Sequence, residues 1–212
     1  MRIYLTRHGQ TVMNTQHIMQ GWKDSPLTEK GIFNAKALAR HLRNVKFHEV
    51  YSSTSGRALH TAELISGFDR GGIRAVDELK EIFLGEWEGR AWEEVEKEYP
   101  EEYRHFWKSP HLYKRNDAES FYDVQKRAIK LIKGLIRQNS CTDNNLLLVS
   151  HTVTVKTIMA YFEEREFERL WEPPYIHDTS LSVIEIDSRG HEILLHGDIS
   201  HLEAENNELK IK

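Results

Sequence analysis

The chain has 212 residues, with 29 Lys and Arg against 33 Asp and Glu, and its formal net charge is −4. This length predicts a single domain, and 39% hydrophobic with 29% charged residues is typical of a globular protein. A mildly acidic chain offers no positive field to nucleic-acid phosphates, so nucleic acid is not an expected partner. The longest strictly apolar run, residues 158–162, is far shorter than the roughly 18 residues of a membrane-spanning helix, so no membrane partner is expected.

The expected compartment follows from the N-terminus and from cysteine usage. Residues 1–9 lack the apolar stretch of a secretory signal, and a single cysteine, Cys141, cannot form an internal disulfide. Both features favour a cytoplasmic protein. Cys141 lies in a polar stretch and is interpreted as incidental, although a catalytic thiol would also be a single cysteine.

Six short β-branched or aliphatic runs predict strands, and apolar residues at helical spacing predict helices between them. The expected strands are residues 2–6, 48–52, 73–77, 146–150, 180–187 and 192–196, with helices after Thr28, near Ser55, over residues 121–135 and near Thr152. This alternation predicts an α/β fold, a single three-layer domain over residues 1–212 with a mostly parallel central sheet and helices on both faces. The last two strands are expected to form a hairpin at one edge.

One segment differs from the rest in composition and predicts a small helical insertion, approximately residues 83–120. Residues 80–122 hold ten of the 21 aromatic residues, and residues 81–102 contain nine glutamates against two cations. Such a segment either forms a satellite core with a solvated acidic face or acts as a lid over a site. We expect a lid.

Charged residues and histidines follow four of the predicted strands. Arg7 and His8 end the first strand, Arg57 follows the second, Glu81 follows the third and His151 ends the fourth. Because ligands of open α/β sheets bind beyond the carboxyl ends of the strands, these five side chains are expected to meet at one rim.

These residue types suit a phosphoryl ligand. Two arginine forks match the oxygens of a small dianion and would give charge-assisted bidentate hydrogen bonds. Helices that begin near Ser55 and Thr152 would add free N–H groups and positive dipole ends. Gly9 would allow the backbone to approach the ligand closely. We therefore expect a phosphate-binding pocket at this rim.

The motifs that contain these residues resemble those of a known family. Residues 5–11, followed by Asn14, are similar to the signature of the histidine phosphatase superfamily, which is phosphoglycerate mutase-like. The likeness continues in the family's order through residues 20–22, 25–31, 57–63, 81–89 and 150–151. Residues 53–57 and 106–111 look most like those of the bacterial broad-specificity phosphatases of bacilli.

The resemblance implies a role for each of the five residues at the rim. His8 would be the nucleophile and become phosphohistidine, while Glu81 would donate a proton to the leaving alcohol. Arg7, Arg57 and His151 would hold the phosphoryl oxygens. The implied reaction is a metal-independent hydrolysis of small-molecule phosphate monoesters with no cofactor. Arginine cations favour neutral His8 and a phosphate dianion favours protonated Glu81, so a rate maximum on the acid side of neutrality is expected.

Further residues would complete the substrate site. The resemblance implies a contribution from Asn14 and from the amides of Gln20 and Gly21. Two positions depart from the family's pattern, because Gln10 stands where many members have Glu and Thr152 follows the second histidine where Gly is common. Thr152 would place a hydroxyl beside the phosphate pocket and alter its size.

The aromatic residues of the insertion are expected to shape the substrate's other end. An apolar mouth would suit aryl or other bulky phosphate esters, and the nine glutamates would disfavour highly anionic ones. The residues expected to form this mouth are Trp87, Trp92, Phe106, Trp107 and Tyr113.

Three other functions remain open. Phosphoglycerate mutase-type phosphotransfer would use the same motifs, but those enzymes resemble this chain less in the insertion, where a basic pair is usual and Glu dominates here. A metal enzyme is suggested by twelve histidines. However, His191 and His196 miss the i, i+4 spacing of helical ligands and would point to opposite faces of a strand. A phosphopeptide-binding module would need neither His8 nor Glu81. The sequence predicts no oligomeric state.

Overall fold

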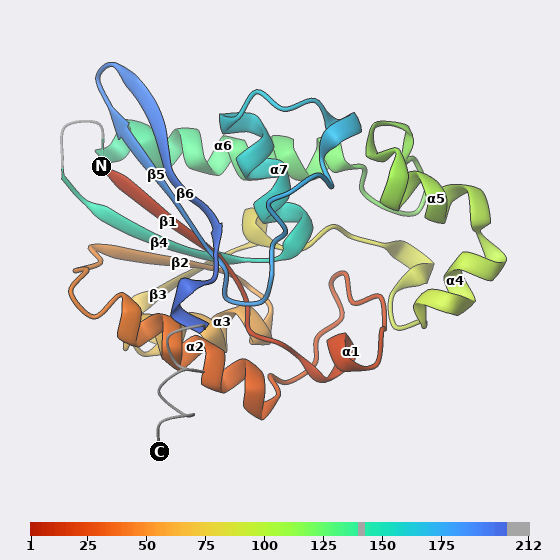
Figure 1. The fold of residues 1–212 in the computed structure, drawn as a ribbon, viewed down its shortest axis with the longest axis horizontal. Helices are drawn as coiled ribbons and strands as arrows, with labels where there is room; N and C mark the ends of the chain where they lie inside the picture. The colour runs from red at the N-terminus through yellow and green to blue at the C-terminus, as the bar shows by residue number, and fades with distance from the viewer. Residues whose placement is uncertain (140–142, 203–212) are drawn as a thin grey trace.

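A six-stranded sheet forms the centre of the computed structural model, which describes residues 1–139 and 143–202 (Figure 1). Cys141 lies outside the described residues. The strands are hydrogen-bonded in the order β3-β2-β4-β1-β5-β6. Their bounds are β1 (Arg2–Arg7), β2 (Glu49–Ser53), β3 (Ile73–Val76), β4 (Asn145–Ser150), β5 (Leu181–Asp187) and β6 (Gly190–Asp198). All six predicted strands are confirmed, with ends that differ from the expected ones by a residue or two.

The sheet is mostly parallel, as predicted. β1 pairs parallel with β4, and β2 pairs parallel with both β3 and β4. β5 pairs antiparallel with β1 and with β6, which confirms the hairpin at one edge. The register of β1 and β4 places Arg7 opposite Ser150, so the residues that follow these two strands, His8 and His151, begin side by side.

Helices cover both faces of the sheet and make the three predicted layers (Figure 1). α2 (Glu29–His41) and α3 (Gly56–Ser66) pack on one face, while α6 (Phe121–Asn139) and α7 (Thr152–Phe162) pack on the other. The two-residue period of a strand divides the core accordingly. In β4, Leu146 and Leu148 contact the α6 and α7 side, whereas Leu147 and Val149 contact the α2 and α3 side.

The insertion packs into a third apolar cluster beyond the carboxyl ends of the parallel strands, and this cluster also includes Phe121 of α6 and Val153 of α7 (Figure 1). It contains α4 (Trp92–Glu98) and α5 (Pro100–Lys108) with short 3-10 turns at Gly85–Trp87 and Pro110–Leu112. Trp87 is fully buried at its centre. The rings of Tyr99, Tyr103, Phe106 and Tyr113 surround it at centroid distances of 5.7 to 6.4 Å. The glutamates of α4 are exposed, so the insertion has both a satellite core and a solvated acidic face.

The remaining short elements connect these layers. α1 (Val12–Thr15) follows β1, and further 3-10 turns lie at Arg70–Gly72, Asp77–Leu79 and Phe167–Arg169. None of the helices in the described parts of the chain combines the length and the apolarity that crossing a bilayer requires.

Candidate active site

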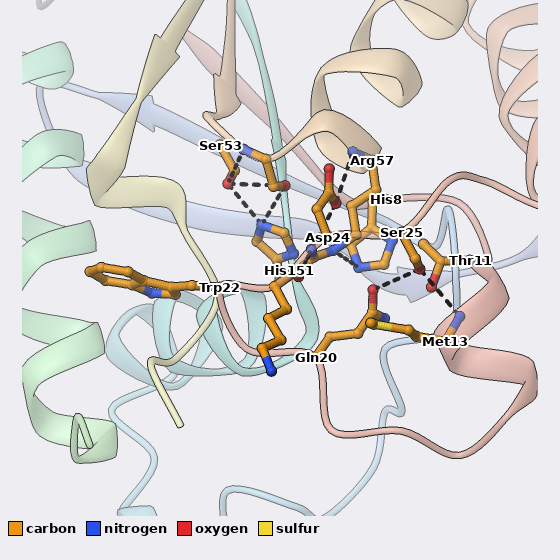
Figure 2. A network of polar contacts seen from close by, with 12 residues as sticks. His8, Thr11, Met13, Gln20, Trp22, Asp24, Ser25, Ser53, Arg57 and His151 are labelled. Atoms are coloured by element: carbon orange, nitrogen blue, oxygen red, sulfur yellow. Dashed lines mark hydrogen bonds and ion pairs between the residues drawn. The ribbon is translucent and has the colours of Figure 1, made fainter. Parts of the chain in front are cut away.

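A cavity of about 200 Å³ lies at the carboxyl edge of the parallel strands. Eight of the nine predicted site residues line it, namely Arg7, His8, Asn14, Gln20, Gly21, Arg57, Glu81 and Thr152. The ninth, His151, lies next to His8, with ring centroids 5.0 Å apart, and lines an adjoining cavity of about 260 Å³. The structure therefore brings all nine together, and Figure 2 shows part of the polar network around His8.

His8 is held as a neutral imidazole with a defined tautomer. Its Nδ1 lies 2.7 Å from the carbonyl oxygen of Gly9. Because a carbonyl only accepts, Nδ1 bears the proton and Nε2 keeps its lone pair. Burial, with the cations of Arg57 and Arg7, holds the pKa of His8 well below its ordinary value. Nε2 is thus an uncharged nitrogen at neutral pH, with the lone pair that a nucleophile needs.

Arg57 is the residue that contacts Nε2 of His8 directly. Its Nε donates to that nitrogen at 3.2 Å, and its guanidinium is otherwise held by the loop over residues 21–24 (Figure 2). Nη2 donates to the Gly21 carbonyl at 2.8 Å. Nη1 donates to the Lys23 carbonyl at 2.7 Å and to Oδ1 of Asp24 at 3.0 Å. Asp24 was not predicted, because this loop has no periodicity and the carboxylate is recognisable only by its position beside the guanidinium.

Arg7 is positioned by the segment that leads into β5. Its Nη1 donates to the carbonyl of Ile176 at 3.0 Å, and its own carbonyl accepts from the amide of Thr179 at 3.2 Å. Its buried Nε has no hydrogen-bond partner within residues 1–139 and 143–202. A buried guanidinium donor without a partner is costly in a protein alone, and an anionic ligand would satisfy it.

His151 is fixed by two hydroxyl groups, one at the end of β2 and one just after it. Its Nε2 lies 2.8 Å from Oγ of Ser53 and 3.3 Å from Oγ of Ser55 (Figure 2). Burial, with Arg57 and His8 nearby, holds the pKa of His151 well below its ordinary value. Its Nδ1 is buried and has no partner in the described part of the chain. Sequence patterns pointed to Ser53 only as part of residues 53–57, and the structure adds it as the residue that orients His151.

Glu81 is held by two backbone amides. Oε1 accepts from the amide of Ile82 at 2.9 Å, and Oε2 accepts from the amide of Val153, in the first turn of α7, at 3.2 Å. Burial raises the pKa of Glu81, although these amides and the cations of Arg57 and Arg7 act in the opposite direction. A carboxyl with a raised pKa is suited to donating a proton.

The remaining predicted residues bring further polar groups to the cavity wall. Asn14 caps α1, because its Oδ1 accepts from the amide and the hydroxyl of Thr11, both at 3.0 Å. Oε1 of Gln20 accepts from Oγ of Ser25 at 3.3 Å. In both residues the amide nitrogen is the group left for a ligand. Gly21 has φ of +52°, and a Cβ there would displace the carboxylate of Glu88, so glycine is favoured.

The aromatic wall of the cavity differs in part from the predicted one. Trp92, Phe106 and Trp107 line it, as expected, but Trp87 and Tyr113 do not. Both are almost fully buried, and their rings pack against each other at 5.7 Å within the insertion's core. The expectation for these two was wrong because composition does not show which side of an aromatic segment faces inward.

Trp171, far from the insertion in sequence, completes the wall. Its Nε1 donates to the carbonyl of Phe106 at 2.6 Å, and its ring lies 5.1 Å from that of Trp107. No sequence pattern links residue 171 to a segment more than sixty positions earlier, so only the fold could identify it.

Comparison with known proteins shows the family to which the chain belongs. The family described as histidine phosphatase superfamily (branch 1) matches residues 3–199. The chain belongs to this superfamily. The adenosylcobalamin/alpha-ribazole phosphatase of Salmonella typhimurium is 32% identical over 171 residues, covering 81% of this chain and 84% of that protein. Phosphoserine phosphatase 1 of Hydrogenobacter thermophilus is 28% identical over 204 residues, covering 95% and 94%.

A solved structure extends the superfamily assignment to the fold. Bacillus stearothermophilus YhfR superposes with a TM-score of 0.90 at 42% identity, covering 95% of this chain and 98% of that one. The predicted superfamily, the likeness to bacillus proteins and the α/β fold are all confirmed. The chain is a phosphatase, that is, a phosphoric monoester hydrolase.

The two departures from the superfamily's pattern lie in different places. Oε1 of Gln10 accepts from the hydroxyl of Thr28 at 2.9 Å, so Gln10 holds the residue that caps α2 and does not line the cavity. Thr152 does line it, at the first position of α7. Gly9 packs against Gly31, whose carbonyl would lie 2.6 Å from an added Cβ. The backbone of Gly9 therefore approaches α2 closely, whereas the sequence predicted a close approach to the ligand.

The histidine pair of β6 also differs from the expectation. His191 Nε2 lies 2.8 Å from the carbonyl of Phe162, and His196 Nδ1 lies 2.7 Å from Oε1 of Glu163, so both rings reach the end of α7. They share a face because the β5–β6 pairing contains a bulge near Leu194, which changes the two-residue alternation. Within the described residues no group of three or more His, Cys, Asp or Glu is arranged to hold a metal ion.

Proposed function

We propose that the enzyme hydrolyses phosphate monoesters through a phosphohistidine at Nε2 of His8, with Glu81 as proton donor and acceptor. The observation that supports this most directly is the tautomer of His8, which leaves a neutral nitrogen with a lone pair in a cavity next to two arginines. The superfamily's name and the phosphatase relatives support the same reaction class.

In the first step the lone pair of His8 Nε2 attacks phosphorus in line, forming the N–P bond as the P–O bond to the alcohol breaks. Glu81 gives its proton to the leaving oxygen. The ring now has a positive charge, and the carbonyl of Gly9 stabilises it by accepting from Nδ1–H at 2.7 Å. Arg7, Arg57 and His151 hold the equatorial oxygens, where charge is greatest.

In the second step water attacks phosphorus from the face that the alcohol has left. Glu81, now ionised, takes a proton from the water, and the N–P bond breaks with its electron pair returning to Nε2. Inorganic phosphate and the original tautomer of His8 are regenerated. No metal ion is needed to balance either step.

The aromatic wall supports a preference for aryl or other bulky alcohols and a broad substrate range. Four rings, those of Trp92, Phe106, Trp107 and Trp171, line the same cavity as the two arginines. Among the described lining residues, Arg7 and Arg57 are the cations, and both lie at the phosphoryl end. Without a cation from the insertion to bind a substrate carboxylate, mutase-type transfer is not favoured.

The nucleophile is tested by trapping the intermediate. We expect the wild type, mixed with a ³²P-labelled ester in excess EDTA and quenched rapidly in alkali, to retain a protein-bound label that acid removes. His8→Ala should lose both the label and the turnover, while His60→Ala on α3, outside the cavity, should keep both. A label that persists in His8→Ala would place the nucleophile on another residue.

The substrate preference is tested separately. Trp107→Ala should lower kcat/KM for naphthyl phosphate more than for glycerol phosphate, because it removes ring contact with the alcohol only. Leu112→Ala is the matched control, since Leu112 is an exposed apolar residue of the insertion that does not line the cavity. Equal effects of Trp107→Ala on both esters would argue against an aromatic alcohol site.

A further inference from the structure

Glu81 lies in a segment whose backbone has no regular hydrogen-bond ladder. Residues 80–84, between β3 and the insertion, are neither helix nor strand. The carbonyls of residues 78–81 are instead bound by side chains from other elements, including Ser150 to Leu79 at 2.7 Å and Thr154 to Lys80 at 2.6 Å. The position of the Glu81 backbone therefore depends on those side chains.

Arg127 of α6 makes the largest share of these contacts. Its Nη1 donates to the carbonyls of Glu78 and Lys80, both at 2.8 Å, and its Nη2 donates to the carbonyl of Glu81 at 2.9 Å. The other two N–H groups form a fork on Glu119, from Nε at 2.8 Å and Nη2 at 3.0 Å. All five guanidinium donors are thus used, three of them on backbone carbonyls of residues 78–81.

Glu119 and Trp22 also bind the backbone of the segment that contains Glu81. The carboxylate of Glu119 accepts from the amide of Phe83 at 2.9 Å, and its own amide donates to the Phe83 carbonyl at 2.9 Å. Nε1 of Trp22 donates to the Glu81 carbonyl at 2.9 Å, as Arg127 does. Two donors from separate elements therefore meet on one carbonyl oxygen.

We propose that Arg127 is a positioning residue for the proton donor of the phosphatase reaction. It does not line the cavity, and the side chain is 18% exposed. Its effect on the chemistry passes through the Glu81 backbone, which fixes where the carboxyl meets the leaving oxygen. General acids act within hydrogen-bond reach, and small displacements lower their effect steeply. This inference rests on the proposed role of Glu81.

A leaving-group comparison separates positioning from general support of the fold. An alkyl ester such as glycerol phosphate needs a proton on its leaving oxygen, whereas p-nitrophenyl phosphate needs it far less. The readout is the ratio of kcat/KM for glycerol phosphate to kcat/KM for p-nitrophenyl phosphate. We expect Arg127→Met to lower this ratio by about tenfold, less than the ~10²–10⁴-fold of a complete general-acid contribution, because Glu81 is displaced and not removed. Lys130→Met, an exposed cation removed from the same helix, should leave the ratio unchanged.

The double variant with Glu81→Gln identifies the residue through which Arg127 acts. Once Glu81 cannot donate a proton, adding Arg127→Met should lower the ratio no further. A ratio unaffected by Arg127→Met, or an equal further loss in the Glu81→Gln background, would overturn the inference. If Arg127→Met does not fold, Trp22→Phe replaces it, because this change removes the other donor to the Glu81 carbonyl and keeps the ring. It should lower the ratio in the same direction, and no change would count against the inference.

Failure of the proposed function gives a different pattern. If Glu81→Gln alone leaves the ratio unchanged, Glu81 is not the proton donor and the proposed mechanism is wrong. If Glu81→Gln lowers the ratio while Arg127→Met and Trp22→Phe do not, the mechanism stands and only the positioning role is lost.

Discussion

Nε of Arg57 donates a hydrogen bond to Nε2 of His8 across 3.2 Å (Figure 2). The lone pair proposed to attack phosphorus is therefore occupied in the free enzyme. A phosphoryl oxygen is a stronger acceptor than a neutral imidazole nitrogen, so a bound substrate would take this N–H and release the lone pair. Substrate binding and release of the nucleophile are thereby coupled through one guanidinium group.

The charge of Arg57 should determine how far the pH can fall before His8 is protonated and can no longer act as the nucleophile. Arg57→Met removes one of the two cations that keep the pKa of His8 low, so this pKa should rise toward its ordinary value while burial still restrains it. NMR titration of the His8 ring would measure the change. The same variant should lose about 10²–10³-fold in kcat/KM, because a stabiliser of transition-state charge is removed.

Arg57→Lys is the matched control for this effect. It keeps a positive charge near His8 but loses the planar fork that binds the 21–24 loop. We expect kcat/KM to fall here as well, with the pKa of His8 staying close to that of the wild type. An unchanged pKa of His8 in Arg57→Met would show that the charge of Arg57 does not contribute to the shift.

Glu81 should determine the alkaline side of the pH profile. Its pKa is raised by burial, so the protonated form persists to higher pH than in an ordinary carboxyl group, and kcat/KM should fall as pH rises through that pKa. With glycerol phosphate, whose leaving oxygen needs the proton, Glu81→Gln should lower the rate and remove this fall. Both proteins experience the same ionisation of the substrate, so their difference isolates Glu81. A wild-type kcat/KM that keeps rising to about pH 9 would contradict the assignment.

Replacing Gly21 should impair both the activity and the stability of the enzyme. A Cβ at φ of +52° would be strained and would also displace the Glu88 carboxylate, which accepts from the amides of Trp22 at 2.8 Å and Leu84 at 3.1 Å. Because the Gly21 carbonyl also binds Arg57, Gly21→Ala should lower both kcat/KM and the free energy of unfolding. Chemical denaturation and steady-state kinetics measure the two effects.

Gly67 provides the matched control. It has φ of +71°, and an added Cβ would meet nothing within 4 Å. Gly67→Ala should therefore cost only the left-handed backbone penalty, roughly 1–2 kcal/mol, with unchanged kcat/KM. Equal losses of stability in the two variants would mean that Glu88 moves aside freely.

The sheet and the five residues at its rim were predictable because their signals are local. A run such as residues 146–149 is buried on both faces, and its composition alone predicts a strand. The direction of the chain then shows which end of the strand is the carboxyl end, where ligands bind. The partners of those five residues were not predictable. Asp24 contacts Arg57 through an irregular loop, and Trp171 reaches the cavity through tertiary packing only.

The direction in which side chains point was the other feature that the sequence could not predict. The sequence correctly placed many aromatic residues in the insertion, but the division between Trp107 in the cavity wall and Trp87 in the core depends on how α4 and α5 pack. Similarly, one extra residue in β6 reverses the expected directions of His191 and His196. A bulge leaves no mark that composition or spacing could show.

His201 should make stability depend on pH below neutrality. The ring is 3% exposed, and its Nε2 lies 3.2 Å from Oγ1 of Thr179, whose amide donates to Arg7. Burial, with His41 nearby, lowers the pKa of His201 to about 4, whereas an unfolded histidine titrates near 6.5. Between about pH 6.5 and 4 the unfolded chain therefore binds more protons than the folded one, and the free energy of unfolding falls as pH falls.

Replacement of this one histidine should flatten that dependence. His201→Gln keeps a hydrogen-bonding group beside Thr179 but cannot be protonated in this range, so its stability should decline less from about pH 6.5 to 4 than that of the wild type. Urea unfolding followed by tryptophan fluorescence at several pH values gives both curves. His8 and His151, whose pKa values are also lowered, contribute equally to the two proteins, so the difference between the slopes belongs to His201. Parallel curves would show that His201 is protonated as readily in the folded chain as in the unfolded one.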